Sequence, residues 1–367
     1  MRTYLDHAAS ASLRPQAVAA MVAAWAEPGN PSSAHTSGRA ARRVVEDARE
    51  ALAAALGAHP DELLFCSGGT EANHLALTGL TTPARPRLAV SAVEHSSVLG
   101  AVGVLSDVDV LAVDGSGRVG DLDKIGTATA LASVQWVNSE TGIVQPVGRV
   151  VDRAHAVGAL AHADAAQALG HVAVDFQASG LDLLTVVAHK VGGPAGIGAL
   201  LVRRGVRLRP HGFGGGQEAG LRSGTVPAAL CAGFAAAATA CVASLDAEAA
   251  RLRVLHDRLI AGVGAIAGAS VNCDQPCSPA IVNVTFAGLR ADDLALLLDR
   301  AGFDCSTGSA CEAGVHRPSP VLLAMGRSLE AASGSLRFSF GPSTTPADVE
   351  ALIAALPDAV TSARAAR

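Results

Sequence analysis

The amino-acid sequence predicts an α/β protein in which a mostly parallel β-sheet lies between layers of helices, with a smaller α+β domain attached. Short apolar runs alternate with helical patterns over the first two thirds of the chain, and polar residues follow the ends of many of these runs. After about residue 245 the pattern changes to charged amphipathic helices that alternate with strands. We therefore expect a large domain over residues 13–245 and a small domain from residues 1–12 and 246–367.

Length and composition narrow the class of protein. The chain has 367 residues, which is too long for one ordinary core, and half of it is apolar. The net charge of −5 is modest and the basic residues are scattered, which disfavours nucleic acid or anionic lipid as a partner and favours a small molecule. The start shows no secretory signal pattern, and the seven cysteines lack a disulfide framework, so we expect a cytoplasmic protein.

The elements of the large domain follow in chain order. A turn and a helix open the chain, and a second helix covers residues 40–56. A strand at 62–67 leads into a helix from residue 72, and a further helix is expected at 147–158. The remaining apolar runs predict strands at 87–95, 107–113, 129–137, 159–165, 183–189 and 197–202. Ligands of such sheets bind at the carboxyl ends of strands, where Glu94, His95, Asn138, Asp164, His189 and Lys190 all fall.

The segment 228–245 is about as long as a thin membrane span, but it is mostly alanine and has no flanking anchors, so we expect a helix packed inside a globular protein. In the small domain, strands are expected around 278–288 and 335–341. Helices are expected around 246–263, 292–302 and 346–357.

Lys190 lies between two apolar runs, where an ammonium group is costly unless it is paired, neutralised or used covalently. One explanation is that it holds pyridoxal 5′-phosphate, with Asp164 at the end of the neighbouring strand as the partner of the pyridine nitrogen. Gln167, on the following turn, could reach the ring hydroxyl, and His95 could stack on the ring. The structural alternatives are a helix N-cap for Asp164, a strand-end lysine for Lys190 and an ordinary structural histidine for His95.

Two glycine-rich stretches could contact a phosphate. Residues 67–71, with Gly69 and Thr70, lie between a strand and a helix, where backbone N–H groups and the helix dipole favour an anion; the alternative is an ordinary helix start with Thr70 as its N-cap. The loop 214–225 contains three consecutive glycines and ends at Thr225; the alternative is a flexible linker. No Gly-Lys-Ser/Thr sequence follows the first stretch, which argues against a nucleoside triphosphate.

Two cysteine-containing stretches lie in the small domain. Cys311 lies in a run of small polar residues, which predicts a mobile, exposed loop where a thiol can act as a nucleophile, whereas Cys305 could be buried. Cys273 and Cys277 would lack two ligands as a metal site, so we expect free thiols and no metal. Arg337, on an alternating strand, could clamp a substrate carboxylate.

With these residues in order, the chain resembles the cysteine desulfurases of the NifS and IscS kind, in the fold-type I, class V aminotransferase-like group. The resemblance runs from YLDHAAS and GNPSSAH through SGGTEAN, VEH, VNSETG, HADAAQALG and AHKVGGPAGIGAL to GGGQEAGLRSGT, STGSAC and LRFSFG. It implies that Lys190 holds pyridoxal phosphate, with Asp164 on the ring nitrogen, Gln167 on the ring oxygen and His95 over the ring face. It further implies phosphate contacts from Gly69, Thr70, His189 and, across a homodimer interface, Thr225; substrate-carboxylate contacts from Asn138 and Arg337; and a persulfide on Cys311.

Two residues depart from the family pattern. Val187 stands where the family usually has a phosphate-binding serine, so one hydroxyl donor is missing unless Ser67 or water replaces it. Glu312 follows Cys311 directly, and a neighbouring carboxylate tends to raise a thiol pKa.

The resemblance implies that the protein converts L-cysteine to alanine and passes sulfur from Cys311 to an acceptor protein, for which an iron–sulfur scaffold is a candidate. Lys190 would remove the substrate Cα proton. The alternatives are a selenocysteine lyase, another carbon–sulfur lyase on the same scaffold, or a non-catalytic protein that only docks a sulfur acceptor.

Overall fold

The computed structural model describes residues 2–80, 82, 84–102, 104–105, 107–210, 212–308 and 318–366. A seven-stranded sheet forms the centre of the large domain, in the order β2-β8-β7-β6-β5-β3-β4. The pairs among β7, β6, β5, β3 and β4 are parallel, whereas β8 runs antiparallel to both β7 and β2. This confirms the predicted α/β class. The strands are β2 (Leu63–Cys66), β3 (Arg87–Ser91), β4 (Val108–Leu111), β5 (Thr129–Gln135), β6 (Leu160–Asp164), β7 (Leu183–Val187) and β8 (Gly198–Val202).

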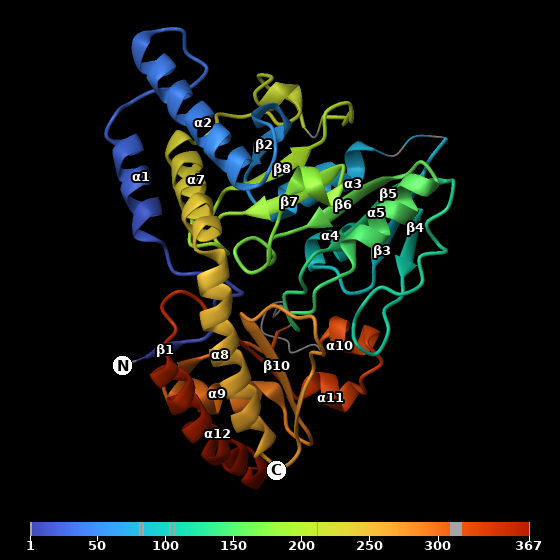
Figure 1. The fold of residues 1–367 in the computed structure, drawn as a ribbon, viewed down its shortest axis with the longest axis vertical. Helices are drawn as coiled ribbons and strands as arrows, with labels where there is room; N and C mark the ends of the chain where they lie inside the picture. The colour runs from blue at the N-terminus through green and yellow to red at the C-terminus, as the bar shows by residue number, and fades with distance from the viewer. Residues whose placement is uncertain are drawn as a thin grey trace.

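Helices cover this sheet on both faces (Figure 1). All residues of β5 and β7 are buried, as expected for strands covered on both sides. The helices of this part are α1 (Pro15–Trp25), α2 (Thr36–Ala55), α3 (Gly69–Gly79), α4 (Ser96–Val102), α5 (Val147–Ala156), α6 (Phe176–Ser179) and α7 (Ala228–Ala243), with 3-10 turns η1 (Pro60–Glu62) and η2 (Glu218–Gly220).

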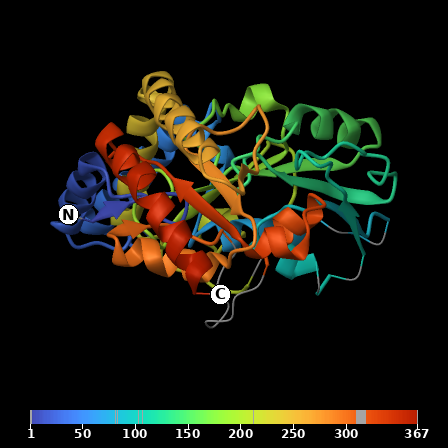
Figure 2. The same ribbon diagram turned by 90° about the horizontal axis from the view of Figure 1, so that it is seen from below.

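The C-terminal part carries an antiparallel sheet of β9 (Ala269–Val271), β10 (Ile281–Phe286) and β12 (Ser335–Ser339), in the order β12-β10-β9. The N-terminal strand β1 (Thr3–Tyr4) joins this part by pairing in parallel with β11 (Phe303–Asp304). Its helices, drawn in orange and red in front of the green central sheet in Figure 2, are α8 (Leu245–Gly264), α9 (Ala291–Arg300), α10 (Pro320–Ala324), α11 (Leu329–Ser333) and α12 (Pro346–Ala365).

Separate hydrophobic cores accompany the two sheets. One core combines Leu5 and Ala8 with residues between 252 and 363, whereas the main cores of the large sheet use residues between 17 and 241. The division at residue 245 stays a prediction, which these cores support.

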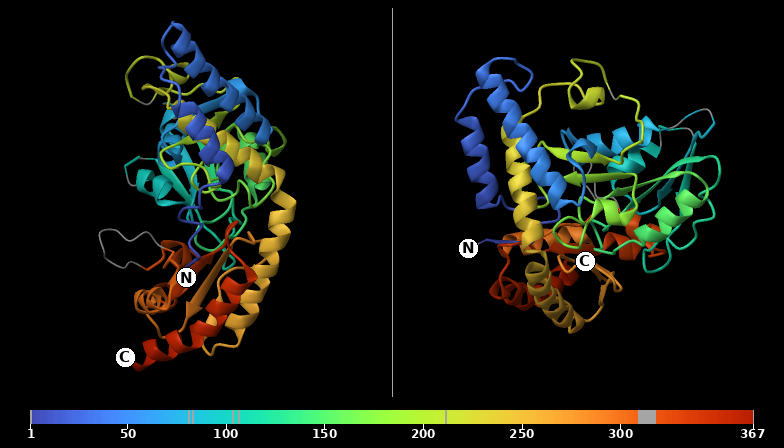
Figure 3. Two further views of the ribbon diagram at one scale, coloured as in Figure 1. Left: turned by 90° about the vertical axis from the view of Figure 1, so that its left-hand side faces the viewer. Right: turned by 45° about the horizontal axis from the view of Figure 1, so that its top comes forward.

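Helices α7 and α8 connect the two parts (Figure 3). Within the described residues no single helix is both long and apolar enough to cross a membrane; α7 and α8 meet the two criteria only together, as a pair bent by 72°. Half of the 16 residues of α7 are buried, and the helix packs against α1 and α2. This agrees with the packed helix expected from its alanine content.

Candidate active site

A cavity of about 280 Å³ lies where β5, β6 and β7 end and α3 begins. It brings together seven of the predicted site residues from separate motifs. These are Gly69, Thr70, His95, Asp164, Gln167, His189 and Lys190. A larger hollow between α3 and α4 shares Thr70 and Ser97 with it but has neither a carboxylate nor a lysine in its lining.

Asp164 is held in one orientation at the end of β6. Its Oδ2 accepts a hydrogen bond of 2.8 Å from Nδ2 of Asn73, and its Oδ1 accepts one of 2.9 Å from the backbone N–H of Ala166. Asn73 also donates to Oγ of Ser97 at 2.9 Å. The carboxylate therefore enters the cavity as a fixed acceptor. Deeper in the sheet, His162 bonds Oγ of Ser133 and Oγ1 of Thr185, and burial lowers the pKa of His162 to about 4.

His95 also lies in a fixed position. Its Nδ1 accepts from the backbone N–H of Ser97 at 3.1 Å and lies 2.9 Å from Oγ of the same residue. Because Nδ1 is an acceptor, the ring proton of the neutral form is assigned to Nε2. Burial lowers the pKa of His95, so the ring is predominantly neutral at pH 7. A neutral, oriented imidazole can lie flat over an aromatic ligand.

Lys190 meets the N-terminal segment of the chain. Its Nζ donates to the backbone oxygens of Ala8 at 2.6 Å and Ala9 at 2.9 Å, and Nε2 of Gln167 donates to the same Ala8 oxygen at 2.7 Å. Burial lowers the pKa of Lys190 to about 8, and the nearby charge of Arg337 adds to this effect. A substantial fraction of the amine is therefore neutral near neutral pH, and a neutral amine is a nucleophile and a base.

The N-terminus of α3 forms the other wall of the cavity. The helix begins at Gly69 with Gly68 as its N-cap, so the alternative in which Thr70 is the N-cap is wrong. A Cβ atom on Gly69 would lie 2.8 Å from Cγ1 of Val187, which leaves room for glycine alone. The exposed N–H groups of a helix start are suited to an anion. His189 lies beside them, and burial lowers its pKa to about 4, so it can donate from a neutral ring.

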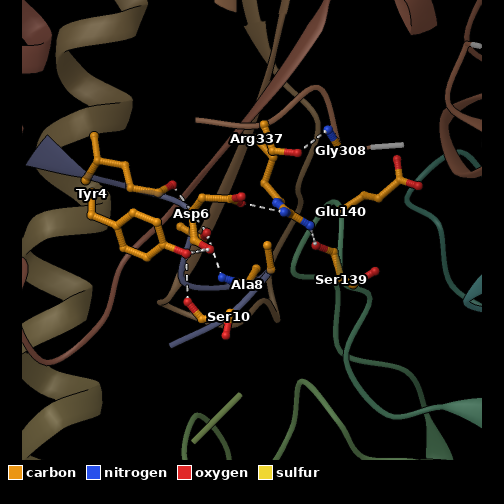
Figure 4. A network of polar contacts seen from close by, with 12 residues as sticks. Tyr4, Asp6, Ala8, Ser10, Ser139, Glu140, Gly308 and Arg337 are labelled. Atoms are coloured by element: carbon orange, nitrogen blue, oxygen red, sulfur yellow. Dashed lines mark hydrogen bonds and ion pairs between the residues drawn. The ribbon is translucent and has the colours of Figure 1, made fainter. Parts of the chain in front are cut away.

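Arg337, on β12, points between Asp6 and Ser139 (Figure 4). Its Nη2 forms an ion pair of 2.6 Å with Oδ1 of Asp6, and its Nη1 donates to the backbone oxygen of Ser139 at 2.9 Å. Its Nε is buried and has no hydrogen-bond partner in the described part of the chain. Asp6 and Ser139 therefore hold the guanidinium group in place, and its Nε is the donor that they leave unpaired.

Comparison with known proteins decides the family. The model of the class-V aminotransferase family matches residues 3–352. The IscS-like cysteine desulfurase of Mycobacterium tuberculosis is 44% identical, over 99% of this chain and 97% of that protein. The chain belongs to the cysteine desulfurases of the class-V aminotransferase family. The structure of a NifS-like protein from Rickettsia africae has a TM-score of 0.91 and 28% identity, covering 98% of this chain and all of that one. The structure of SspA in complex with cysteine has a TM-score of 0.80 and 32% identity, covering 94% of this chain and all of that one.

Arg337 and three further residues that the resemblance to cysteine desulfurases points to are not part of the cavity lining, although Ser139, which Arg337 contacts, is. The side chain of Asn138 donates to the backbone oxygen of Val93 at 3.0 Å and accepts three hydrogen bonds from Glu140 and Thr141, so it shapes the turn that presents Ser139. Thr225 is exposed between η2 and α7. Ser67 is exposed too, and does not take the place of the missing serine hydroxyl at Val187.

Cys311 and Glu312 of this cysteine desulfurase lie outside the described residues. The described residues on either side of them contact Arg337 and Glu140. Ser306 exchanges backbone hydrogen bonds with Arg337, and Oγ of Ser319 donates to Oε2 of Glu140 at 2.5 Å.

Four residues of the site had no role assigned from the sequence. Three of them lie within the motifs SGGTEAN, YLDHAAS and VNSETG, and the fourth lies two residues after VEH; a polar residue in or beside such a motif is the signal that could have indicated them. They are Asn73, Ser97, Asp6 and Ser139.

Proposed function

We propose that this protein is a pyridoxal 5′-phosphate-dependent enzyme that converts L-cysteine to L-alanine and leaves the sulfur as a persulfide on Cys311. The observation that carries the proposal is the combination, in one cavity, of a lysine amine with a lowered pKa and a fixed carboxylate. Membership of the cysteine desulfurases gives the reaction class.

The residues present fit the cofactor. Lys190 supplies the amine that would react with the cofactor's aldehyde, and Asp164 supplies the partner for its ring nitrogen. The start of α3, together with Thr70 and His189, supplies the donors for its phosphate. Gln167 would contact the ring oxygen, and His95 would cover the ring face. When bound, pyridoxal phosphate withdraws electrons from the substrate Cα and so makes its proton removable.

Arg337 is the proposed anchor for the substrate carboxylate. A guanidinium group recognises a carboxylate through paired donors, and its free Nε provides one of them. Asn138 acts through the turn that presents Ser139. The likeness to SspA, whose structure contains cysteine, supports this choice of substrate.

Lys190 then moves the proton from Cα as general base, since its pKa of about 8 places it close to the working range. The Cys311 thiolate attacks the substrate sulfur, the Cβ–S bond breaks, and a proton completes alanine. The products are alanine and a Cys311 persulfide, so the atoms of cysteine and thiol are all accounted for.

Three further elements belong to the proposal. Thr225, exposed in a single chain, would be donated to the phosphate site of the second subunit of a homodimer. The persulfide sulfur would pass to an acceptor protein, for which an iron–sulfur scaffold is a candidate. The described cysteines are all free thiols, which suits the reducing cytoplasm.

Two substitutions test the function. Lys190→Ala should lose the visible absorbance of the bound cofactor and all turnover. Cys311→Ala should keep that absorbance and lose sulfide production from cysteine. Desulfuration of cysteine by Cys311→Ala at the wild-type rate would contradict the persulfide route. Turnover of selenocysteine by Cys311→Ala at the wild-type rate would favour a selenocysteine lyase.

A further inference from the structure

A second group of reactive side chains lies outside the Lys190 cavity, around Cys277. Two side-chain N–H donors point at its Sγ, Nε2 of Gln275 at 3.3 Å and Nη1 of Arg253 at 3.8 Å, and Nε2 of His256 lies 3.7 Å from it. His256 is oriented through Nδ1, which lies 3.0 Å from Oδ1 of Asp257. None of these residues lines the Lys190 cavity. Such a set of donors, one of them an arginine, stabilises a thiolate.

Cys273 is the partner of this thiol. Cys273 stands four residues before Cys277 in the same loop, and its interaction with Cys277 is the main influence that lowers the pKa of Cys277; His256 and Arg253 act in the same direction and burial opposes them. The same interaction raises the pKa of Cys273. The two residues therefore divide into a thiolate and a thiol, as in dithiols in which one sulfur attacks and the other resolves.

The other described cysteines lack such surroundings. Burial raises the pKa of Cys66, Cys231 and Cys305 to about 12 and that of Cys241 to about 11. They are matched internal controls, since all of them would be present in the same sample. A metal is not the better interpretation of the Cys277 surroundings, because no group of three or more ligating side chains is found among the described residues.

The pair lies where the two domains meet. Arg118 of the large domain donates to the backbone oxygens of Asp274 and Pro276 at 2.8 and 2.9 Å, and Cys277 forms a backbone bridge with Ile143. From the other side, Nη2 of Arg253 donates to the backbone oxygen of Cys277 at 2.8 Å, so the loop is held by both parts of the chain. Cys277 itself is 5% exposed and Cys273 is partly exposed, so a small oxidant suits the site better than a protein disulfide.

We propose that Cys277 and Cys273 form a peroxide-reactive dithiol, with Cys277 as the attacking thiolate and Cys273 as the resolving thiol. The Cys277 sulfur attacks one oxygen of hydrogen peroxide, an S–O bond forms, the O–O bond breaks, and hydroxide leaves and is protonated to water. Cys273 then attacks that sulfur, the S–S bond forms, the S–O bond breaks, and the oxygen leaves as a second water with the Cys273 proton. Two thiols and one peroxide give one disulfide and two waters, and two electrons pass to the peroxide.

The test uses the holoenzyme and does not depend on turnover, so it stands apart from the proposed desulfuration. Protein treated with hydrogen peroxide is quenched with an alkylating reagent at timed intervals and mapped by mass spectrometry without reduction. A linked 273–277 species, 2 Da lighter than the dithiol, should form at least about tenfold faster than oxidation of Cys66, Cys231, Cys241 or Cys305. Oxidation of Cys277 no faster than these thiols, or a disulfide from Cys277 to another cysteine, would overturn the proposal.

Two variants assign the roles. Cys273→Ser should stop the reaction at the sulfenic acid, which dimedone traps on Cys277. Cys277→Ser should form no disulfide at Cys273, and Cys273 should then be labelled by dimedone more slowly than Cys277 is in Cys273→Ser. The reverse pattern would overturn the assignment, and the wild-type time course decides the proposal by itself if either variant does not fold.

Discussion

The Asp164 end of the cavity is built within the large domain from neighbouring sheet and helix elements, whereas the Arg337 end joins distant parts of the chain. Asn73 and Asp164, which meet at the first end, are 91 residues apart; Asp6 and Arg337, which meet at the second, are 331 apart. Asp6 pairs with Arg337 inside the C-terminal part, to which the N-terminal strand belongs, whereas Ser139 meets Arg337 from the large sheet, so the position of the guanidinium group depends on both parts of the chain. The comparison suggests that the first end sets the chemistry and the second sets the recognition of substrate.

Asp164→Asn should have the largest effect, because it removes a charge from the fixed end. An asparagine cannot accept from both Asn73 and Ala166, and loss of a buried charge partner costs about 2–5 kcal/mol. We expect kcat to fall by roughly 30- to 5,000-fold, measured as alanine formation at saturating cysteine. Ser97→Ala removes a neutral hydrogen bond from the same network and should lower kcat only about two- to tenfold. Equal losses in the two variants would show that the carboxylate charge is not needed.

The lowered pKa of Lys190 can be measured without turnover. The sequence contains two lysines, Lys190 and the surface residue Lys124, so the second is an internal reference. Half of the Lys190 amine should be neutral at about pH 8, whereas an ordinary lysine is less than about 1% neutral there. Reductive methylation of cofactor-free protein, followed by mass spectrometry of each lysine peptide, should therefore give a pH midpoint near 8 for Lys190. A pH midpoint near 10 for Lys190 would mean that its amine is not buried in solution.

Arg337→Lys tests the end that is shared between domains. Lysine keeps the charge but cannot offer the paired donors of a guanidinium group, so about 1.5–3 kcal/mol of substrate binding should be lost. We expect kcat/KM for L-cysteine to fall roughly 10- to 150-fold, mostly through KM, with the cofactor absorbance unchanged. Arg203→Lys, remote from the cavity and packed over Phe176, is the matched control. A loss in kcat with KM unchanged would place Arg337 in the chemistry instead.

The two ends also differ in how far the sequence could predict them. Asp164, His189 and Lys190 stand at the ends of apolar strands, and a parallel sheet brings such ends to one edge, so their meeting follows from local patterns. The Asp6 and Ser139 contacts of Arg337 depend on how the N-terminal segment and the small domain dock, which no local pattern specifies. Asn138 illustrates the same limit, since its side chain turned inward to hold a turn.

Val187→Ser should give the smallest effect, at the fixed end. Val187 is buried against Gly69, and a serine there would add a hydroxyl donor to the proposed phosphate site while removing apolar contacts. A hydrogen bond to a charged group is worth about 1.5–3 kcal/mol at most, and the N–H groups of α3 already serve the site, so we expect pyridoxal phosphate to bind roughly tenfold more tightly. Titration of cofactor-free protein by absorbance measures this.

Val187→Ala is the matched control for that measurement, because it removes the same methyl groups without adding a hydroxyl. Both variants should lose about 1 kcal/mol or more of folding stability through the small cavity they create, and only the serine should gain affinity. If serine and alanine bind the cofactor equally, the start of α3 with Thr70 and His189 satisfies the phosphate by itself. Val187 would then be a packing residue that does not weaken cofactor binding. The Asp164 end of the cavity would then have more phosphate donors than binding requires.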